Sequence, residues 1–109
     1  MTDTFPKPLA VGYISAQALA AASELTTLKR DITEFAIACG FILLATFVED
    51  SETTPAAFDD MVQNTWRNGV RTIIMPSVIH LACLGNPVVM KAHLEHHLGG
   101  KVLFTNSAA

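Results

Sequence analysis

The sequence predicts an α/β fold, with a mainly parallel sheet and helices on both of its faces. Short apolar runs rich in β-branched residues alternate along the chain with longer stretches of helical periodicity. The run at residues 41–48 is apolar on both of its faces, which is typical of a parallel strand that is covered on both sides. Strands that alternate with helices favour a parallel sheet joined by right-handed crossovers.

The composition predicts one domain with a sizeable core. The chain has 109 residues, of which 50% are apolar, and no repeat or internal linker divides it. We expect residues 1–8 to be an N-terminal tail and residues 9–109 to form a single α/β domain.

The first two elements are predicted to be a buried strand and a long helix. Residues 9–14 (LAVGYI) have the content of a buried strand. The helix is expected over residues 16–39, because an apolar stripe recurs there at nearly 3.6-residue spacing and Gly40 can end it. The stripe consists of Leu25, Leu28, Ile32, Phe35 and Cys39.

A second strand and a second helix are expected next. The strand covers residues 41–48, and an acidic segment, EDSETT, follows it. Pro55 suits the first position of a helix over residues 55–68, which Gly69 ends. This helix is expected to bury Phe58, Val62, Thr65 and Trp66.

The last third of the chain predicts a strand, an irregular segment, a helix and a final strand. The third strand is expected at residues 71–75, and the irregular segment 76–87 holds one short apolar turn at 78–81. The helix covers residues 87–98, Gly99 and Gly100 close it, and residues 101–105 form the fourth strand.

The charge does not favour nucleic-acid binding by this chain alone. Seven Lys and Arg stand against ten Asp and Glu, for a net charge of −3. The basic residues form no run longer than two, whereas tight phosphate binding takes about 6–10 positioned cations.

The sequence also favours a cytoplasmic protein that does not enter a membrane. The longest apolar run, at residues 35–48, is interrupted by Gly40 and is shorter than the roughly 20 residues that a membrane helix needs. The N-terminus has neither the charged nor the apolar region of a signal peptide. Cys39 and Cys83 are therefore expected to be free, buried thiols.

Three segments together resemble the catalytic domain of serine recombinases, the resolvase/invertase family. They are VGYISAQ before the long helix, FVEDSETTPAAFDDMV after the second strand and TIIMPSVIHLACLGN after the third. The resemblance covers about residues 9–105 and implies a three-layer, flavodoxin-like topology. In that family a serine after the first strand attacks a DNA phosphate, and several arginines stabilise the charge that develops on it.

The resemblance places other residues at the family's chemical positions. Ser15 stands at an arginine, and Gln17 stands at the nucleophilic serine. The remaining replacements are Thr54 for an arginine, Ile79 for an aspartate, and His80 and Cys83 for two arginines. Scaffold residues such as Pro55, Phe58 and Leu81 are kept.

These replacements predict a non-enzymatic domain that needs no cofactor. A glutamine amide is not a nucleophile, and phosphoryl transfer by serine needs fixed cations around the phosphate. The resemblance therefore implies an inactive member that serves as an interaction or regulatory module. Weak nucleic-acid binding without cleavage is a further alternative.

Another alternative is a small-molecule site or an unrelated enzyme at the carboxyl ends of the strands, where α/β proteins bind ligands. His80 and Cys83 could form a nucleophilic pair, although His80 is expected to be an exposed loop residue. The candidate binding residues are Ser15, Gln17, Glu49, Asp50, Ser77, His80 and Cys83.

An apolar segment where the family has a polar catalytic loop predicts a protein interface. Contiguous exposed apolar patches commonly mark partner surfaces. We expect either a homo-oligomer or another protein partner at this edge. The candidate interface residues are Val78, Ile79, Leu81, Leu84, Val88 and Val89.

A histidine group on the last helix carries only a weak metal signal. His93 and His97 have the i,i+4 spacing at which two imidazoles can share a metal, and His96 lies beside them. No third ligand is evident, so we expect an exposed helix face and no metal site.

Overall fold

The computed structural model describes residues 7–19, 21–50 and 56–105, and it contains a four-stranded parallel sheet with the strand order β2-β1-β3-β4. The strands are β1 (Leu9–Ser15), β2 (Ile42–Glu49), β3 (Thr72–Met75) and β4 (Lys101–Phe104). The helices are η1 (Ala16–Ala18, a 3₁₀ turn), α1 (Glu24–Ala38), α2 (Ala56–Asn68), α3 (Val78–Ala82) and α4 (Pro87–Leu98).

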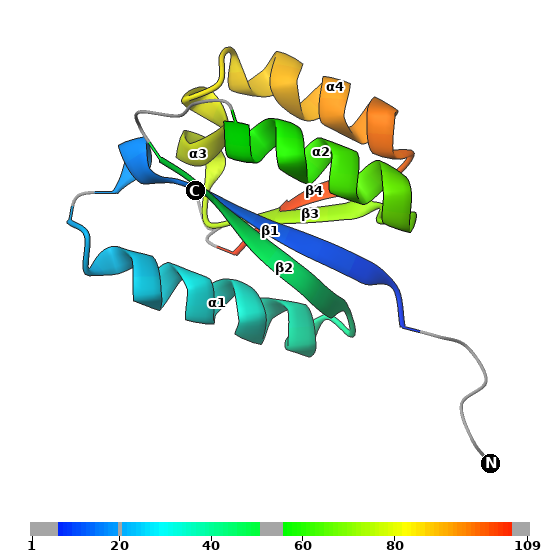
Figure 1. Cartoon of the computed structure of the whole chain (residues 1–109), viewed down its shortest axis with the longest axis horizontal. Helices are drawn as coiled ribbons and strands as arrows, with labels where there is room; N and C mark the ends of the chain where they lie inside the picture. The colour runs from blue at the N-terminus through cyan, green and yellow to red at the C-terminus, as the bar shows by residue number, and fades with distance from the viewer. Residues whose placement is uncertain (1–6, 20, 51–55, 106–109) are drawn as a thin grey trace.

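The molecule has three layers, with α1 on one face of the sheet and α2, α3 and α4 on the other (Figure 1). This arrangement and the strand order confirm the predicted α/β class and the flavodoxin-like topology. Helices return the chain between successive parallel strands, so all four strands end at the same edge of the sheet. We call this the carboxyl edge, and the opposite one the amino edge.

The α1 face depends on a close approach between helix and sheet. Ile32 and Ala36 of α1 pack on alternate residues of the central strands, among them Ile14 and Ile74. A Cβ at Gly12 of β1 would lie 2.9 Å from Cγ2 of Ile32 and 2.9 Å from Oγ1 of Thr46. Glycine therefore lets α1 approach the sheet at this point.

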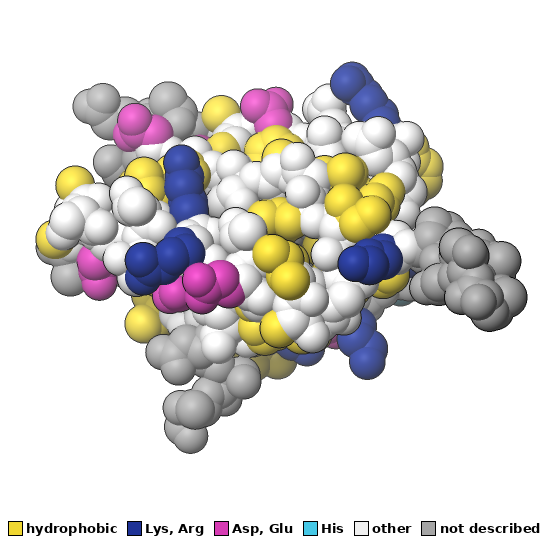
Figure 2. Space-filling view, turned by 90° about the horizontal axis from the view of Figure 1, so that it is seen from below, with side chains coloured by type: hydrophobic (Ala, Val, Ile, Leu, Met, Phe, Trp, Pro, Cys, Tyr) yellow, Lys and Arg dark blue, Asp and Glu magenta, His cyan; other side chains and the backbone are white. Residues whose placement is uncertain are grey.

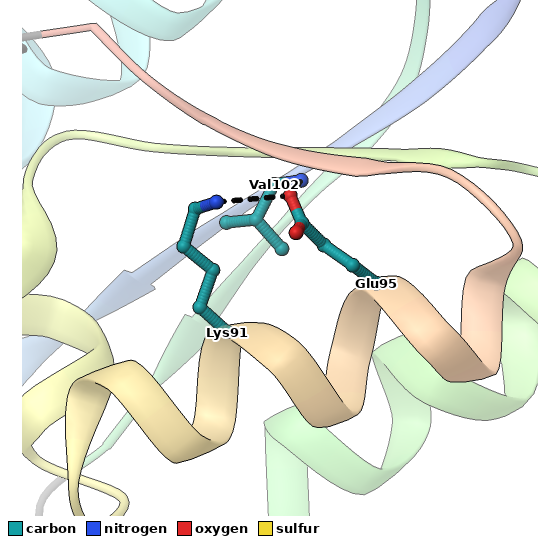
Figure 3. A network of polar contacts seen from close by, with 3 residues as sticks. All are labelled: Lys91, Glu95 and Val102. Atoms are coloured by element: carbon teal, nitrogen blue, oxygen red, sulfur yellow. Dashed lines mark hydrogen bonds and ion pairs between the residues drawn. The ribbon is translucent and has the colours of Figure 1, made fainter.

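The opposite face holds the larger core. Buried side chains from the central strands and from β4 pack there against Met61 of α2, Leu81 of α3 and Leu94 of α4. A polar contact also joins α4 to β4, since Glu95 Oε2 accepts the Val102 N–H at 3.0 Å and lies 3.1 Å from Lys91 Nζ (Figure 3). The Val102 N–H lowers the pKa of the Glu95 carboxyl, and Lys91 adds to this effect.

Two helices differ from their predicted bounds. The helix expected from residue 16 begins only at Glu24, because the chain first makes the η1 turn and then an extended residue at Leu19. The Ala-rich segment has high helix propensity, but the chain must first pass from the end of β1 to the α1 layer. The predicted irregular segment contains the short helix α3.

Three burial predictions were wrong. Strand β2 is an edge strand with no neighbour on its outer side, so Ile42 and Leu44 are exposed. Trp66 is 73% exposed, because the side of α2 that faces the sheet carries Met61 and Thr65. Both cysteines are free as predicted, but Cys39 is exposed and Cys83 is half-buried.

Among the described residues, no helix combines the length and the apolar character that a membrane crossing requires.

Candidate functional site

The carboxyl edge is formed by the ends of β1 and β2 and by the turn from β3 into α3. Ser15 and Glu49 are register partners at the last residues of β1 and β2, and both are buried. Ser77 precedes α3, which carries His80. The topology thus brings residues from three parts of the sequence to one edge, as expected for a parallel sheet.

His80 is buried and attached to the end of β1, which contradicts its expected place in an exposed loop. Its Nδ1 accepts the Ser15 backbone N–H at 2.9 Å. A nitrogen that accepts carries no proton, so the neutral ring has its proton on Nε2. Burial lowers the pKa of the His80 imidazole, and the nearby Glu24 carboxylate opposes this with a smaller upward effect. His80 therefore serves as a neutral acceptor.

Glu49 stabilises the start of α2. Its carboxylate accepts the N–H of Phe58 at 2.9 Å and of Ala57 at 3.2 Å, and the hydroxyl of Tyr13 donates to it at 3.3 Å. Negative charge is favourable at a helix N-terminus, where backbone N–H groups lack partners within the helix. Burial raises the pKa of the Tyr13 phenol, and the Glu49 carboxylate adds to the rise. Glu49 thus has a structural role.

The other candidate binding residues are dispersed along the edge. Gln17 is exposed in η1, and Asp50 is exposed just after β2. Ser77 is half-buried, and its side chain makes no capping hydrogen bond to α3. Cys83 is half-buried at the end of α3, and no hydrogen bond between described residues joins it to His80. Thr54 and Pro55, quoted for the family resemblance, lie outside the described residues.

A groove of about 690 Å³ runs between α1 and the ends of β3 and β4. Ser77 and His80 line it together with three carboxylates of α1, which are Glu24, Asp31 and Glu34. Sequence reasoning missed these acids, although their spacing of seven and three residues places them along one side of a helix. The three carboxylates repel anions, and the neutral imidazole adds no positive charge. The groove is therefore unsuited to a phosphate.

None of the seven Lys and Arg lies at the carboxyl edge, and all seven fall within the described residues. Arg67 ends α2, and Arg71 precedes β3, so both lie at the amino edge. Lys7 precedes β1 and Lys101 begins β4, so both lie at the same edge. The remaining three are Lys29 and Arg30 on α1 and Lys91, which pairs with Glu95 on α4.

The histidines of α4 do not converge on a common point. His93, His96 and His97 are exposed, and the ring of His97 lies 5.6 Å from that of Trp66. Within the described part of the chain, no group of three or more His, Cys, Asp or Glu side chains could hold a metal ion.

The candidate interface residues fall into two groups. Val78 and Ile79 of α3 and Val88 and Val89 of α4 are between 47% and 78% exposed. Leu81 instead lies in the core, where α3 packs against the sheet, so it cannot contact a partner. Leu84 is half-buried against the same core.

Comparison with solved structures identifies the fold. The C-terminal catalytic domain of ISC1926 TnpA, an IS607-like serine recombinase, superposes with a TM-score of 0.67. The match covers 92% of this chain and 69% of that chain, at 16% sequence identity. The chain has a serine recombinase-like fold. The resemblance predicted from three short segments is therefore confirmed at the level of the fold.

No family model and no curated protein matches the sequence. The serine recombinase-like fold is thus recognised through its backbone, and the residues at the carboxyl edge have to be judged by their own chemistry.

Proposed function

We propose that this serine recombinase-like domain is a non-catalytic module that acts through protein–protein contacts. The observation that carries the proposal is the position of the cations. Transfer of a phosphoryl group requires positive charge around the phosphate, and an arginine that supplies it is typically worth about 10³–10⁵ in rate. Here the groove beside His80 is acidic, and Arg67 and Arg71 lie at the opposite edge of the sheet.

The candidate nucleophiles support the same proposal. Gln17, at the position of the family's serine, has no nucleophilic atom. Ser15 is the nearest hydroxyl in sequence, but it is 1% exposed and its backbone N–H is bound to His80. A side chain so deeply buried cannot reach a DNA phosphate, so a shift of register by two residues would not restore the chemistry.

The exposed apolar residues of α3 and α4 support a protein partner. Residues 76–90 contain no Asp, Glu, Lys or Arg, which is unusual for a surface segment. Within it, Val78, Ile79, Val88 and Val89 expose much of their side chains at the carboxyl edge. Apolar surface of this kind gains free energy when a partner removes it from water.

Two measurements test the proposal. Purified protein should leave supercoiled plasmid DNA neither nicked nor relaxed, and nicking that copurifies with the full-length chain would contradict it. The Ile79→Asp variant, which places a charge on the apolar surface, should bind a protein partner more weakly than the wild type does. The matched control is Ile37→Asp, because Ile37 is 71% exposed on α1. Equal effects of the two variants would also contradict the proposal.

A second candidate function is the binding of a small cation in the groove beside α1. The observation that favours it is the set of three carboxylates that line a volume of about 690 Å³. A polyamine or another small amine would raise the melting temperature if it bound the folded protein. Glu34→Gln should reduce that rise, whereas a rise of equal size in the variant would contradict binding at this place.

A further inference from the structure

Charge is separated between the two edges of the sheet. Four exposed basic residues lie at the amino edge: Lys7, Arg67, Arg71 and Lys101. Four exposed acidic residues lie at or near the carboxyl edge: Glu24, Asp50, Asp59 and Asp60. Figure 2 shows the α1 face, where most acidic side chains lie away from the end at which β1 begins, whereas basic side chains stand both toward that end and among the acidic ones.

The amino edge also carries an exposed aromatic platform. Trp66 of α2 lies against His97 of α4, with ring centroids 5.6 Å apart and planes inclined by 34°. Two hollows of about 220 and 290 Å³ flank this pair, and Val62, Val70 and Leu98 give them apolar walls. Arg71 lines the first hollow and Arg67 the second. Tryptophan and arginine around an apolar hollow are the residues that most often dominate protein interfaces.

The carboxyl edge carries features that fit such hollows. Val88 and Val89 project from the first turn of α4, and Ile79 projects from α3. Isolated aliphatic side chains of this size are suited to hollows of a few hundred cubic ångströms. The acidic residues at or near the same edge carry the charge opposite to that of Arg67 and Arg71.

We infer that copies of this chain associate head to tail, with the start of α3 and α4 in one copy docked on the Trp66–His97 platform of the next. The inference rests on the proposed function and names the partner as a second copy. Contact between two identical edges would set four charges of one copy against four of the same sign in the other, which is unfavourable, whereas contact between opposite edges pairs unlike charges. An interface between different surfaces leaves one of each free at the ends, so association continues beyond the dimer unless a ring closes.

The only tryptophan of the chain lies in this interface, so its fluorescence reports the contact directly. Wild-type emission should shift to shorter wavelength as protein concentration rises, and the apparent mass should exceed the 11.7 kDa of one chain. Trp66→Ala and Val88→Asp should each raise the protein concentration at which self-association is half complete by about tenfold or more. Both side chains are largely exposed, and an aspartate is favourable in the first turn of α4, so both variants should fold.

The deciding experiment mixes the two variants. Val88→Asp keeps Trp66 and an intact amino edge, whereas Trp66→Ala has no tryptophan and keeps an intact carboxyl edge. The mixture should form a dimer and nothing larger, with a blue shift of the one tryptophan present. No shift on mixing, or a wild type that stays monomeric at all concentrations, would overturn the inference.

Matched controls separate this inference from the proposed function. Arg71→Glu should weaken wild-type association, whereas Arg30→Glu makes the same change in charge on α1 and should leave it intact. Equal effects of these two variants would overturn the head-to-tail contact. If Ile79→Asp abolishes association and Trp66→Ala does not, the apolar surface still binds a partner and only the head-to-tail geometry fails.

Discussion

Replacing His80 with alanine should destabilise the fold by about 3 kcal/mol. The variant leaves the buried Ser15 N–H without its acceptor at 2.9 Å, and an unpaired buried donor costs about 1–3 kcal/mol. Loss of the packed imidazole adds a comparable amount. Since unfolding of a globular protein has an entropy of about 2.1 cal/mol/K per residue, 3 kcal/mol lowers the melting temperature of 109 residues by about 13 °C.

The same histidine predicts how stability depends on pH. Burial lowers the pKa of the folded-state imidazole, so below its ordinary value of about 6.5 the unfolded chain binds more protons than the folded protein. The stability that the neutral imidazole contributes should therefore be fully present above pH 6.5. It should fall as the pH drops from there toward the folded-state pKa, by at most about 1.4 kcal/mol per pH unit for one proton.

Chemical denaturation between pH 5 and pH 8 measures both effects. His80→Asn offers an amide oxygen near the position of Nδ1, so it should recover part of the stability that alanine loses. Both variants should lose the dependence on pH that this imidazole contributes. If His80→Ala is as stable as the wild type, or keeps the full dependence on pH, the Ser15 hydrogen bond does not have the role assigned to it.

Substitutions at three further positions test contacts that join helices to the sheet. Glu49→Ala should lower the free energy of unfolding in urea by about 3 kcal/mol, because two helix N–H groups lose a charged acceptor. Glu49→Gln should lower it less, and equal losses would contradict the capping role. The lowered pKa of Glu95 contributes stability above the ordinary pKa of a carboxyl group, and this is lost as the pH falls through the folded value. Glu95→Gln should thus lower the free energy of unfolding by about 1 kcal/mol or less at neutral pH. If the variant still loses as much stability as the wild type when the pH falls, the Val102 contact is not the cause of that loss. Gly12→Ala should destabilise by about 1–3 kcal/mol by crowding Ile32, and a neutral effect on the melting temperature would show that α1 can move away.

The sequence predicts the fold class because local pattern and tertiary structure agree over most of the chain. Three of the four strands are dominated by apolar side chains that pack on a helix layer, and Gly40, Gly69 and Gly99 mark the ends of helices, where they take positive φ angles. The start of α1 was predicted too early, because alanine propensity does not report the distance that the chain must cover from β1.

The candidate site was less accessible to sequence reasoning, because burial and partners depend on the sheet order. An apolar run such as residues 41–48 is compatible with either a central or an edge strand, so the exposure of Ile42 could not be predicted. His80 follows a strand as loop residues do, and only the α3 geometry turns it inward to Ser15. Trp66 lies one residue beyond Thr65 on α2, which rotates it by about 100° away from the sheet.

The central claim is that the carboxyl edge has no recombinase chemistry, and covalent trapping tests it most directly. Purified protein is incubated with supercoiled and linear DNA, denatured without proteolysis and analysed by mass spectrometry for a phosphodiester between protein and DNA. We predict that no side chain carries DNA, because no cation accompanies Ser15 and Gln17 cannot attack. An adduct on Ser15, or on any other hydroxyl of the chain, would contradict the account.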